Sequence, residues 1–401
     1  MINYRYRKML SAVLLLLLAT SMSLAWGPRT QMAIVNTALN LMAREQNLPL
    51  TRLQNDIRAG VRCDEKVLEN IYPDLATDPM RTIENEMALL TAVRQPKVDA
   101  YYAYRLGTLG RIVSAITAPM RDADSAERDQ YYADVDRAVD SGALTPAPRR
   151  IFETLAPFER VMREANMAND LIQTEYRSGV GFKGAASARL AADVSRSVNA
   201  VADIWWTIVA SSAVAGNISD AQLQRYVLNG YRYRIAGENE TEIDAAEAYY
   251  SEITPFTPAM RADIGDMLYE AGLRERAVKQ YEAVLAAKPE RRDVVKKIGE
   301  YYMELGEEAL KNDNLEDALA AFEKALDANA LHPTAEQRRL EVVALIAERD
   351  ALQREYQETL KQAEELRNLA EQEAGRARYA EAVALLQQSQ AAYQSVGDEF
   401  P

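Results

Sequence analysis

Hydrophobic residues recur along this chain every three or four positions, which is the spacing of one face of an α-helix. One such run comprises Val98, Tyr102, Leu106, Leu109, Val113 and Ile116. A second run, from Ala188 to Ser211, carries Val194, Val198, Val201, Ile204, Trp205 and Ile208. No window shows the sustained alternation, bounded by Asn-Gly or Asp-Gly turns, that indicates strands. The pattern predicts an all-α fold.

Proline, glycine and aspartate interrupt this periodicity at residues 72–79, 141–148 and 179–184, where we expect loops. The sequence GVGFKG in the last of these lacks the spacing and the trailing Lys-Ser/Thr of a phosphate-binding loop, which favours a plain helix–helix connection. The TPFTP segment, from Thr254 to Pro258, breaks the pattern more strongly. We therefore place a domain boundary there, with one domain over residues 26–253 and another over residues 258–401.

The second domain contains an internal repeat. Its matched positions are Gly265, Ala277 and Tyr281 in one copy and Gly306, Ala318 and Phe322 in the next. Small residues at fixed offsets allow antiparallel helices to pack closely, and the aromatic residue fills the gap between neighbouring hairpins. Ala277 and Ala318 are 41 residues apart, so we expect an extended helix around residues 298–305. A weaker third copy covers residues 378–393, and the composition of Ala335 to Glu373 predicts one long charged helix or a coiled-coil arm.

The segments AVKQYEAVLAAKP and NLEDALAAFEKALDAN resemble tetratricopeptide repeats. The resemblance implies an α-solenoid whose concave face binds a peptide or a partner protein. The period differs from the family's, which is about 34 residues. The alternative is that the repeats only extend the first domain.

The first 25 residues have the features of an export signal. Three basic residues precede an apolar run over residues 10–19, and small residues stand third and first before Trp26. A membrane anchor is the alternative, but the run is shorter than the roughly 20 apolar residues that a spanning helix needs. The pattern predicts a signal peptide over residues 1–25, no later transmembrane segment, and a periplasmic or secreted protein.

The composition of the chain limits the kinds of binding and catalysis that it can support. The net charge of −13 argues against a general nucleic-acid-binding surface, which needs clustered Lys and Arg. Cys63 is the single cysteine, so no internal disulfide is expected. His332 is the single histidine. Because imidazole is the commonest transition-metal ligand and the usual base near neutral pH, this chain has few means for such chemistry.

AWGPRTQMAIVNTAL, beginning at Ala25, resembles the mature N-terminus of the zinc-dependent phospholipase C and single-strand nuclease superfamily. The resemblance implies an exported, all-α domain in which the α-amino nitrogen and carbonyl oxygen of Trp26 would bind zinc. In the nuclease branch a histidine follows five residues later, where this chain has Gln31. The segment from Leu106 to Arg121 is similar to the family's central helix, and the resemblance covers about residues 26–215.

Of the remaining ligand positions, Asp74 is the counterpart of the family's Pro-Asp ligand and Asp136 is the counterpart of a later acid, while the others differ from the family's pattern. In the central helix, ligands at i and i+4 share one face and a further ligand follows in a loop. At the positions that the family uses for metal ligands this chain has Asp74, Arg111, Ala115, Arg121, Tyr132 and Asp136. Glutamine is a poor zinc ligand, alanine is none, and arginine stays protonated. We therefore expect no metal and no other cofactor.

The arginines suggest a hypothesis. Arg111 and Arg121 would replace the positive charge of the metal and pair with Asp74 and Asp136, because a buried charge must be paired. Such a pocket could still hold an anion such as a phosphate group. The alternative is that both arginines point to solvent.

Other candidates are weaker. The carboxylate pairs Glu84/Glu86 and Asp134/Asp136 could do acid–base work, but acidic residues are abundant and a solvated face is the simpler interpretation. Basic neighbours could lower the pKa of Cys63, and His332 is expected at a turn. The aromatic and arginine mixture of residues 226–234 indicates a ligand surface or helix packing. Asn217 and Asn239 fit the glycan acceptor pattern.

These features predict an exported, non-catalytic protein. A phospholipase-C-like helical domain that has lost its metal site precedes repeats that bind or scaffold other proteins. The alternative is a phosphodiester hydrolase with an altered metal site built from the Trp26 amine, Asp74 and Asp136.

Overall fold

A computed structural model describes residues 26–45, 49–139, 145, 147–210, 218–330 and 332–399. The predicted signal peptide, most of the predicted loop at 141–148, and Asn217 lie outside these residues. Every regular element in the described part of the chain is a helix, which confirms the all-α prediction. In the same part, no helix has the length and apolar content to cross a membrane.

The chain divides into two compact units between Pro255 and Phe256, inside the TPFTP segment. The first unit contains α2 (Pro28–Glu45), η1 (Pro49–Leu53), α3 (Gln54–Val61), α4 (Glu65–Ile71), α5 (Pro79–Ala92), α6 (Ala100–Ile116), α7 (Ser125–Ala138), α8 (Ala156–Asn166), α9 (Asn169–Arg177), η3 (Gly181–Lys183), α10 (Ala185–Ala210), α11 (Asp220–Ala236), α12 (Glu240–Asp244) and α13 (Ala246–Ser251). The second contains α14 (Pro258–Glu270), α15 (Arg274–Ala287), α16 (Arg292–Lys311), α17 (Leu315–Ala328), α18 (Ala335–Gly375) and α19 (Tyr379–Glu399).

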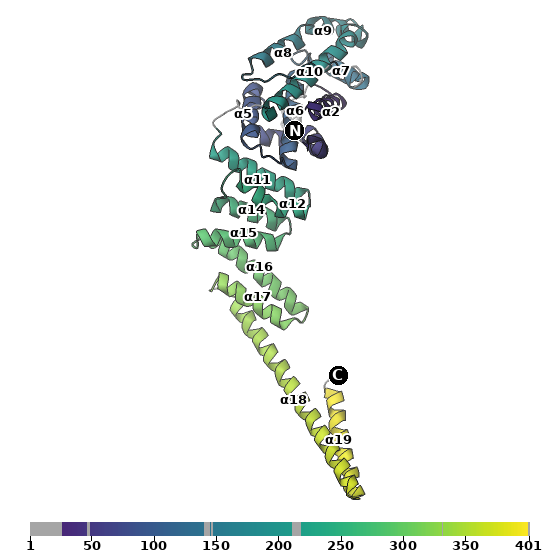
Figure 1. The fold of residues 1–401 in the computed structure, drawn as a ribbon, viewed down its shortest axis with the longest axis vertical. Helices are drawn as coiled ribbons and strands as arrows, with labels where there is room; N and C mark the ends of the chain where they lie inside the picture. Colours follow the sequence, from purple (N-terminus) through teal and green to yellow (C-terminus); the bar gives the residue numbers. More distant parts are fainter. Residues whose placement is uncertain are drawn as a thin grey trace, which may run out of the picture. The chain divides into compact units, whose positions relative to one another are not determined.

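Helix α6 is the centre of the first unit, with α2, α3, α5, α10 and α11 packed around it (Figure 1). Every residue of α6 from Tyr101 to Ile116 is buried. The sequence pattern predicted an amphipathic helix with one apolar stripe, whereas the structure buries every face of it. Helices surround α6 on all sides, so its polar residues are buried as well and need partners inside the protein.

Glycines allow α3 and α6 to approach closely. A Cβ atom on Gly107 would lie 2.0 Å from the carbonyl oxygen of Ile57, and one on Gly60 would lie 2.1 Å from that of Tyr104. Backbone atoms cannot move aside as a flexible side chain can. Both positions therefore require glycine for packing rather than for a special backbone conformation.

Replacing Gly107 with alanine should force α3 and α6 apart and lower the free energy of unfolding by about 1–3 kcal/mol, the usual cost of overpacking. Gly375→Ala is the matched control, because nothing lies within 4 Å of a Cβ atom there. Urea unfolding of both variants checks this. Equal midpoints for Gly107→Ala and the unsubstituted chain would contradict the close packing.

The start of α6 is fixed by an internal ion pair. One carboxylate oxygen of Asp99 accepts the backbone N–H of Tyr102, capping the helix. The other accepts the Nη2–H of Arg234 at 3.0 Å and the hydroxyl of Tyr250 at 2.7 Å. Arg234 also lies over the Tyr250 ring. These contacts tie α11 and α13 to the central helix.

The second unit is built from helices packed in antiparallel pairs. A Cβ atom on Gly265 would meet the ring of Tyr281 at 2.4 Å, and one on Gly306 would meet the ring of Phe322 at 2.5 Å. Ala277 and Ala318 are fully buried. The same glycine–aromatic contact therefore joins α14 to α15 and α16 to α17, at the positions that the sequence matched.

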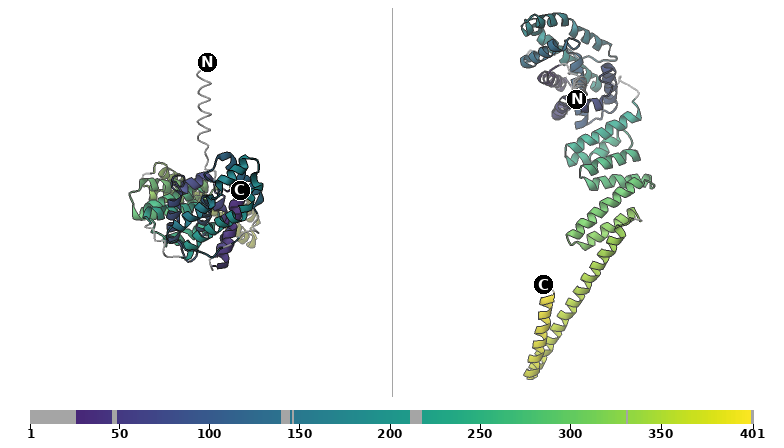
Figure 2. Two further views of the ribbon diagram at one scale, coloured as in Figure 1. Left: turned by 90° about the horizontal axis from the view of Figure 1, so that it is seen from above. Right: turned by 180° about the vertical axis from the view of Figure 1, so that it is seen from behind.

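The end of the second unit differs from the first two pairs. Helix α18 has 41 residues and covers the segment expected to be one long helix. Helix α19 runs back beside its C-terminal half in both views (Figures 1 and 2). Ser389 of α19 donates a hydrogen bond to the carbonyl oxygen of Ala363 at 2.7 Å. The predicted third repeat copy thus falls on a single helix that packs against α18.

Candidate functional site

Trp26 is enclosed by the first unit, with 1% of its surface exposed. Its indole Nε1–H donates a hydrogen bond of 3.2 Å to the Ser197 hydroxyl on α10. Its ring lies 6.2 Å from that of Tyr131 and 5.9 Å from that of Tyr132, both on α7, with the second pair edge to face. Trp26 is therefore held by aromatic packing and one satisfied donor.

Gln31 lies directly against Trp26. Its amide Nε2 donates to the carbonyl oxygen of Trp26 at 2.8 Å, and its side chain is buried. In the nuclease branch of the superfamily that the sequence resembles, the equivalents of that carbonyl oxygen and of the side chain at position 31 are both metal ligands. Here they bind each other instead.

Asp136 binds the start of α2. One carboxylate oxygen accepts the backbone N–H of Thr30 at 2.7 Å and the Thr30 hydroxyl at 2.9 Å. A Cβ atom on Gly27 would lie 2.5 Å from the Asp136 carboxyl carbon, so Gly27 leaves the room for this contact. A carboxylate at a helix N-terminus satisfies free N–H groups and complements the helix dipole. Asp136 acts as a cap supplied by α7.

Tyr132 closes the other side of this cluster. Its buried hydroxyl donates to the carbonyl oxygen of Pro119 at 2.7 Å. Burial raises the pKa of Tyr132 above its ordinary value, so the hydroxyl stays protonated and able to donate. The structure thus brings together four of the positions singled out from sequence: Trp26, Gln31, Tyr132 and Asp136. Thr30 and Ser197 complete the cluster, and sequence patterns gave no sign of either.

Arg111 does not belong to this cluster. It is buried on α6, where its Nη1 donates to the carbonyl oxygen of Cys63 and lies 3.5 Å from the Cys63 sulfur. Its Nε–H has no partner. Ala115, one turn further along α6, is buried as an ordinary core residue.

The expected pairing of the two arginines with Asp74 and Asp136 is wrong. Arg121 is partly exposed and pairs with its neighbour Asp122 at 3.4 Å. Asp74 is exposed on the turn after α4, and the Asp136 carboxylate accepts a hydrogen bond from Thr30. The physical reason is distance along α6: Asp74 lies near Arg105, whereas the Trp26 cluster lies near Thr117, about 18 Å further along the helix axis.

A zinc centre of the kind that the resemblance implies does not fit these residues. Gln31 and Asp136 already bind protein atoms, and Ala115 and Arg111 have no lone pair to offer. Asp74 lies at a different part of α6, so the alternative site built from Trp26, Asp74 and Asp136 is not assembled either. Within the described residues, no three His, Cys, Asp or Glu side chains converge to hold a metal ion.

Cys63 is partly buried between α3 and α4. Burial raises the pKa of its thiol above the ordinary value, and the nearby charge of Arg111 only partly opposes this effect. The basic neighbours noted in the sequence do not lower it. The raised pKa makes Cys63 a poor nucleophile, since the thiolate is the reactive form.

We expect native Cys63 to react with iodoacetamide at neutral pH more slowly than the urea-unfolded chain, because the folded thiol stays protonated and shielded. The rate should rise as pH increases towards the raised pKa. Mass spectrometry of timed samples measures it. A native rate equal to or above the unfolded rate would contradict this description of the thiol.

The remaining candidates are separated by the fold. Glu84 is exposed and Glu86 is buried, so they do not form a carboxylate pair, and Asp134 binds Tyr176 and Arg137 rather than acting with Asp136. Tyr226, Tyr231 and Arg234 of the segment 226–234 are buried and pack between helices, and Tyr226 and Asn229 also line a hollow beside α6. His332 accepts the backbone N–H of Ala335 at the start of α18, and Asn239 caps α12.

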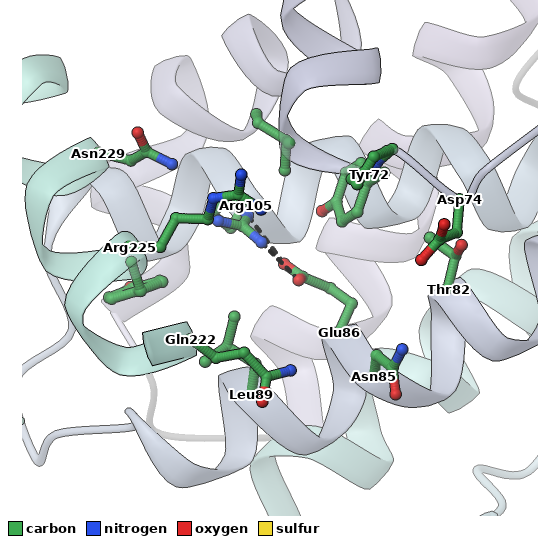
Figure 3. Close-up of a pocket in the computed structure, with 13 residues that line it drawn as sticks. Tyr72, Asp74, Thr82, Asn85, Glu86, Leu89, Arg105, Gln222, Arg225 and Asn229 are labelled. Carbon is green, nitrogen blue, oxygen red and sulfur yellow. Dashed lines mark hydrogen bonds and ion pairs between the residues drawn. The ribbon is translucent and has the colours of Figure 1, made fainter. Parts of the chain in front are cut away.

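A polar hollow that the sequence did not suggest opens beside the first half of α6 (Figure 3). It has a volume of about 170 Å³, and its lining includes Tyr72, Asp74, Glu86, Arg105, Arg225 and Asn229. At its floor Arg105 makes a two-point contact with Glu86, at 2.9 Å and 2.5 Å. The one sequence sign was an arginine inside the otherwise aromatic and apolar stretch AYYAYRLG, because such a charge needs a buried partner.

Comparison with known proteins adds no assignment. No family model matches this chain, no curated protein is similar to it, and no solved structure matches its fold.

Proposed function

We propose that this chain is an exported, non-catalytic binding protein that holds another protein on its helical repeats. In this proposal the first unit is a phospholipase-C-like domain whose metal site has been replaced by side-chain packing, and the second unit is a tetratricopeptide-like solenoid. The sequence resemblances support the two assignments. The internal hydrogen bonds of Trp26, Gln31 and Asp136 support the loss of metal chemistry.

One observation carries the binding function: a groove of about 430 Å³ between α16 and α17. Leu305, Ala309 and Ala321 provide apolar surface in it, and Leu305 is 41% exposed. Polar side chains, including Glu308 and Asp317, surround this apolar surface. An apolar centre with a polar rim is the usual anatomy of a protein-binding site.

Charge indicates the kind of partner. Glu308 and Asp317 line the groove together with a single basic residue, Lys324. Acidic residues outnumber basic ones in the second unit as a whole. A partner segment with an apolar side chain for Leu305 and basic residues for the rim is complementary to this groove.

Photo-crosslinking in living cells tests the proposal. A photoreactive residue replaces Leu305 in the full chain, and Leu171, an exposed apolar residue on α9 of the first unit, is the matched control position. We expect position 305 to give a discrete adduct with a second protein that position 171 does not give. Glu308→Lys should reduce that adduct, because it reverses a charge at the rim.

Two results would count against this binding surface. One is an identical set of adducts from positions 305 and 171. The other is a discrete adduct from position 305 that Glu308→Lys leaves unchanged, since charge complementarity would then play no part.

A further inference from the structure

The hollow beside α6 has an ion pair as its floor. The side chains of Arg105 and Glu86 are 5% and 3% exposed. The Arg105 guanidinium also lies against the rings of Tyr72, Tyr101 and Tyr226, at 5.3 to 5.7 Å. A charged pair that is packed this tightly is fixed in orientation.

The floor of the hollow is formed by the polar groups of Arg105 and Glu86. A guanidinium carries five N–H donors. Arg105 donates one N–H to each Glu86 oxygen and one N–H to the Tyr101 hydroxyl. Arg105 and Glu86 both line the hollow, so a molecule bound there would lie against a guanidinium and a carboxylate.

The two sides of the hollow carry opposite charges that do not pair. Arg225 reaches in from α11 on one side, and Asp74 lies on the other side, beyond the Glu86–Arg105 contact (Figure 3). Among the described residues, neither side chain makes an ion pair. The hollow is therefore positive at the Arg225 side and negative at the Asp74 side.

We propose that this hollow binds a small zwitterion of the free α-amino-acid class. The ligand carboxylate would face Arg225, since arginine binds carboxylates with a two-point fork, and the ligand ammonium group would face Asp74 and Glu86. The side-chain amides of Asn85 and Asn229 lie at the same hollow and can hydrogen-bond to the ligand.

Size and charge favour a zwitterion over other ligands. The volume of about 170 Å³ suits a small molecule. A simple anion would leave Asp74 without a partner, and a simple cation would leave Arg225 without one. A molecule with both charges satisfies both sides.

Thermal unfolding and calorimetric titration of the full chain test the proposal. The probes are the common L-amino acids in turn at about 10 mM, a concentration that detects millimolar binding, with propionate and ethylamine as single-charge counterparts of alanine. We expect at least one amino acid to raise the melting temperature and to bind measurably. Propionate and ethylamine should not.

Variants locate the site. Arg225→Gln and Asp74→Asn should each weaken binding of that amino acid at least tenfold. Arg81→Gln and Glu84→Gln are the matched controls, because both residues are exposed on α5 and neither lines the hollow; binding should be unchanged in them.

Three outcomes would overturn the proposal. The first is the absence of a shift with every amino acid tested. The second is binding of propionate or ethylamine as tight as that of the amino acid, which would indicate a single-charge site. The third is unchanged binding in Arg225→Gln and Asp74→Asn, which would place the ligand elsewhere.

Discussion

Replacing Glu86 with alanine should lower the free energy of unfolding by about 3–5 kcal/mol, the cost of leaving a buried charge without its partner. Arg105 would remain between three tyrosine rings, with 5% of its side chain exposed and no carboxylate to receive its two-point contact. Because the side chain is almost fully buried, solvation would recover little. Urea unfolding, followed by circular dichroism, measures the loss.

Two comparisons make this prediction specific. Glu84→Ala removes an exposed carboxylate two residues away on α5 and should change stability by less than about 0.5 kcal/mol. Replacing both partners, as Glu86→Leu with Arg105→Met, should recover much of the loss, because apolar side chains of similar volume often replace a buried pair at little cost. Equal effects of Glu86→Ala and Glu84→Ala would contradict the burial of this pair.

Replacing Trp26 with alanine should lower the free energy of unfolding by about 3–5 kcal/mol, as for other fully buried aromatic residues. The change removes the ring that packs against Tyr131 and Tyr132 and leaves a cavity between α7 and α10. It also leaves the Ser197 hydroxyl without its indole donor. Denaturant unfolding of the processed chain measures the effect.

Trp26→Phe separates packing from hydrogen bonding. It keeps most of the aromatic volume and loses the contact with Ser197, so the expected loss is about 1 kcal/mol from that bond plus a smaller packing term. If Trp26→Ala were as stable as Trp26→Phe, the ring would not be part of the core, and the enclosed Trp26 cluster would be wrong.

Much of the fold follows from sequence periodicity, because helices depend mainly on local spacing. The long helix α18 and the extended α16 lie where composition and repeat spacing placed them. The spacing of apolar residues does not show which other elements will pack against a helix. Helix α6 has the pattern of an amphipathic helix but is buried on every face. A single helix cannot show how many neighbours will cover it.

The candidate site was less predictable for the same reason. Trp26 and Gln31 share one helix start, so their proximity could be read locally. The partners of Arg111 and Asp136 come from residues 48 and 106 positions away in sequence, which no local pattern reveals. The hollow between α5, α6 and α11 depends on three separate helices, and although the sequence singled out Asp74 and Glu86, no local pattern placed them beside Arg105.

The central claim is that side chains rather than a metal ion fill the Trp26 cluster. Measuring the transition-metal content of the processed full-length protein tests this claim most directly. After incubation with zinc and dialysis, elemental analysis should find no tightly bound zinc in proportion to the chain, because Gln31 and Asp136 already bind protein atoms. About one or more zinc ions per chain, lost in an Asp136→Asn variant, would contradict the account.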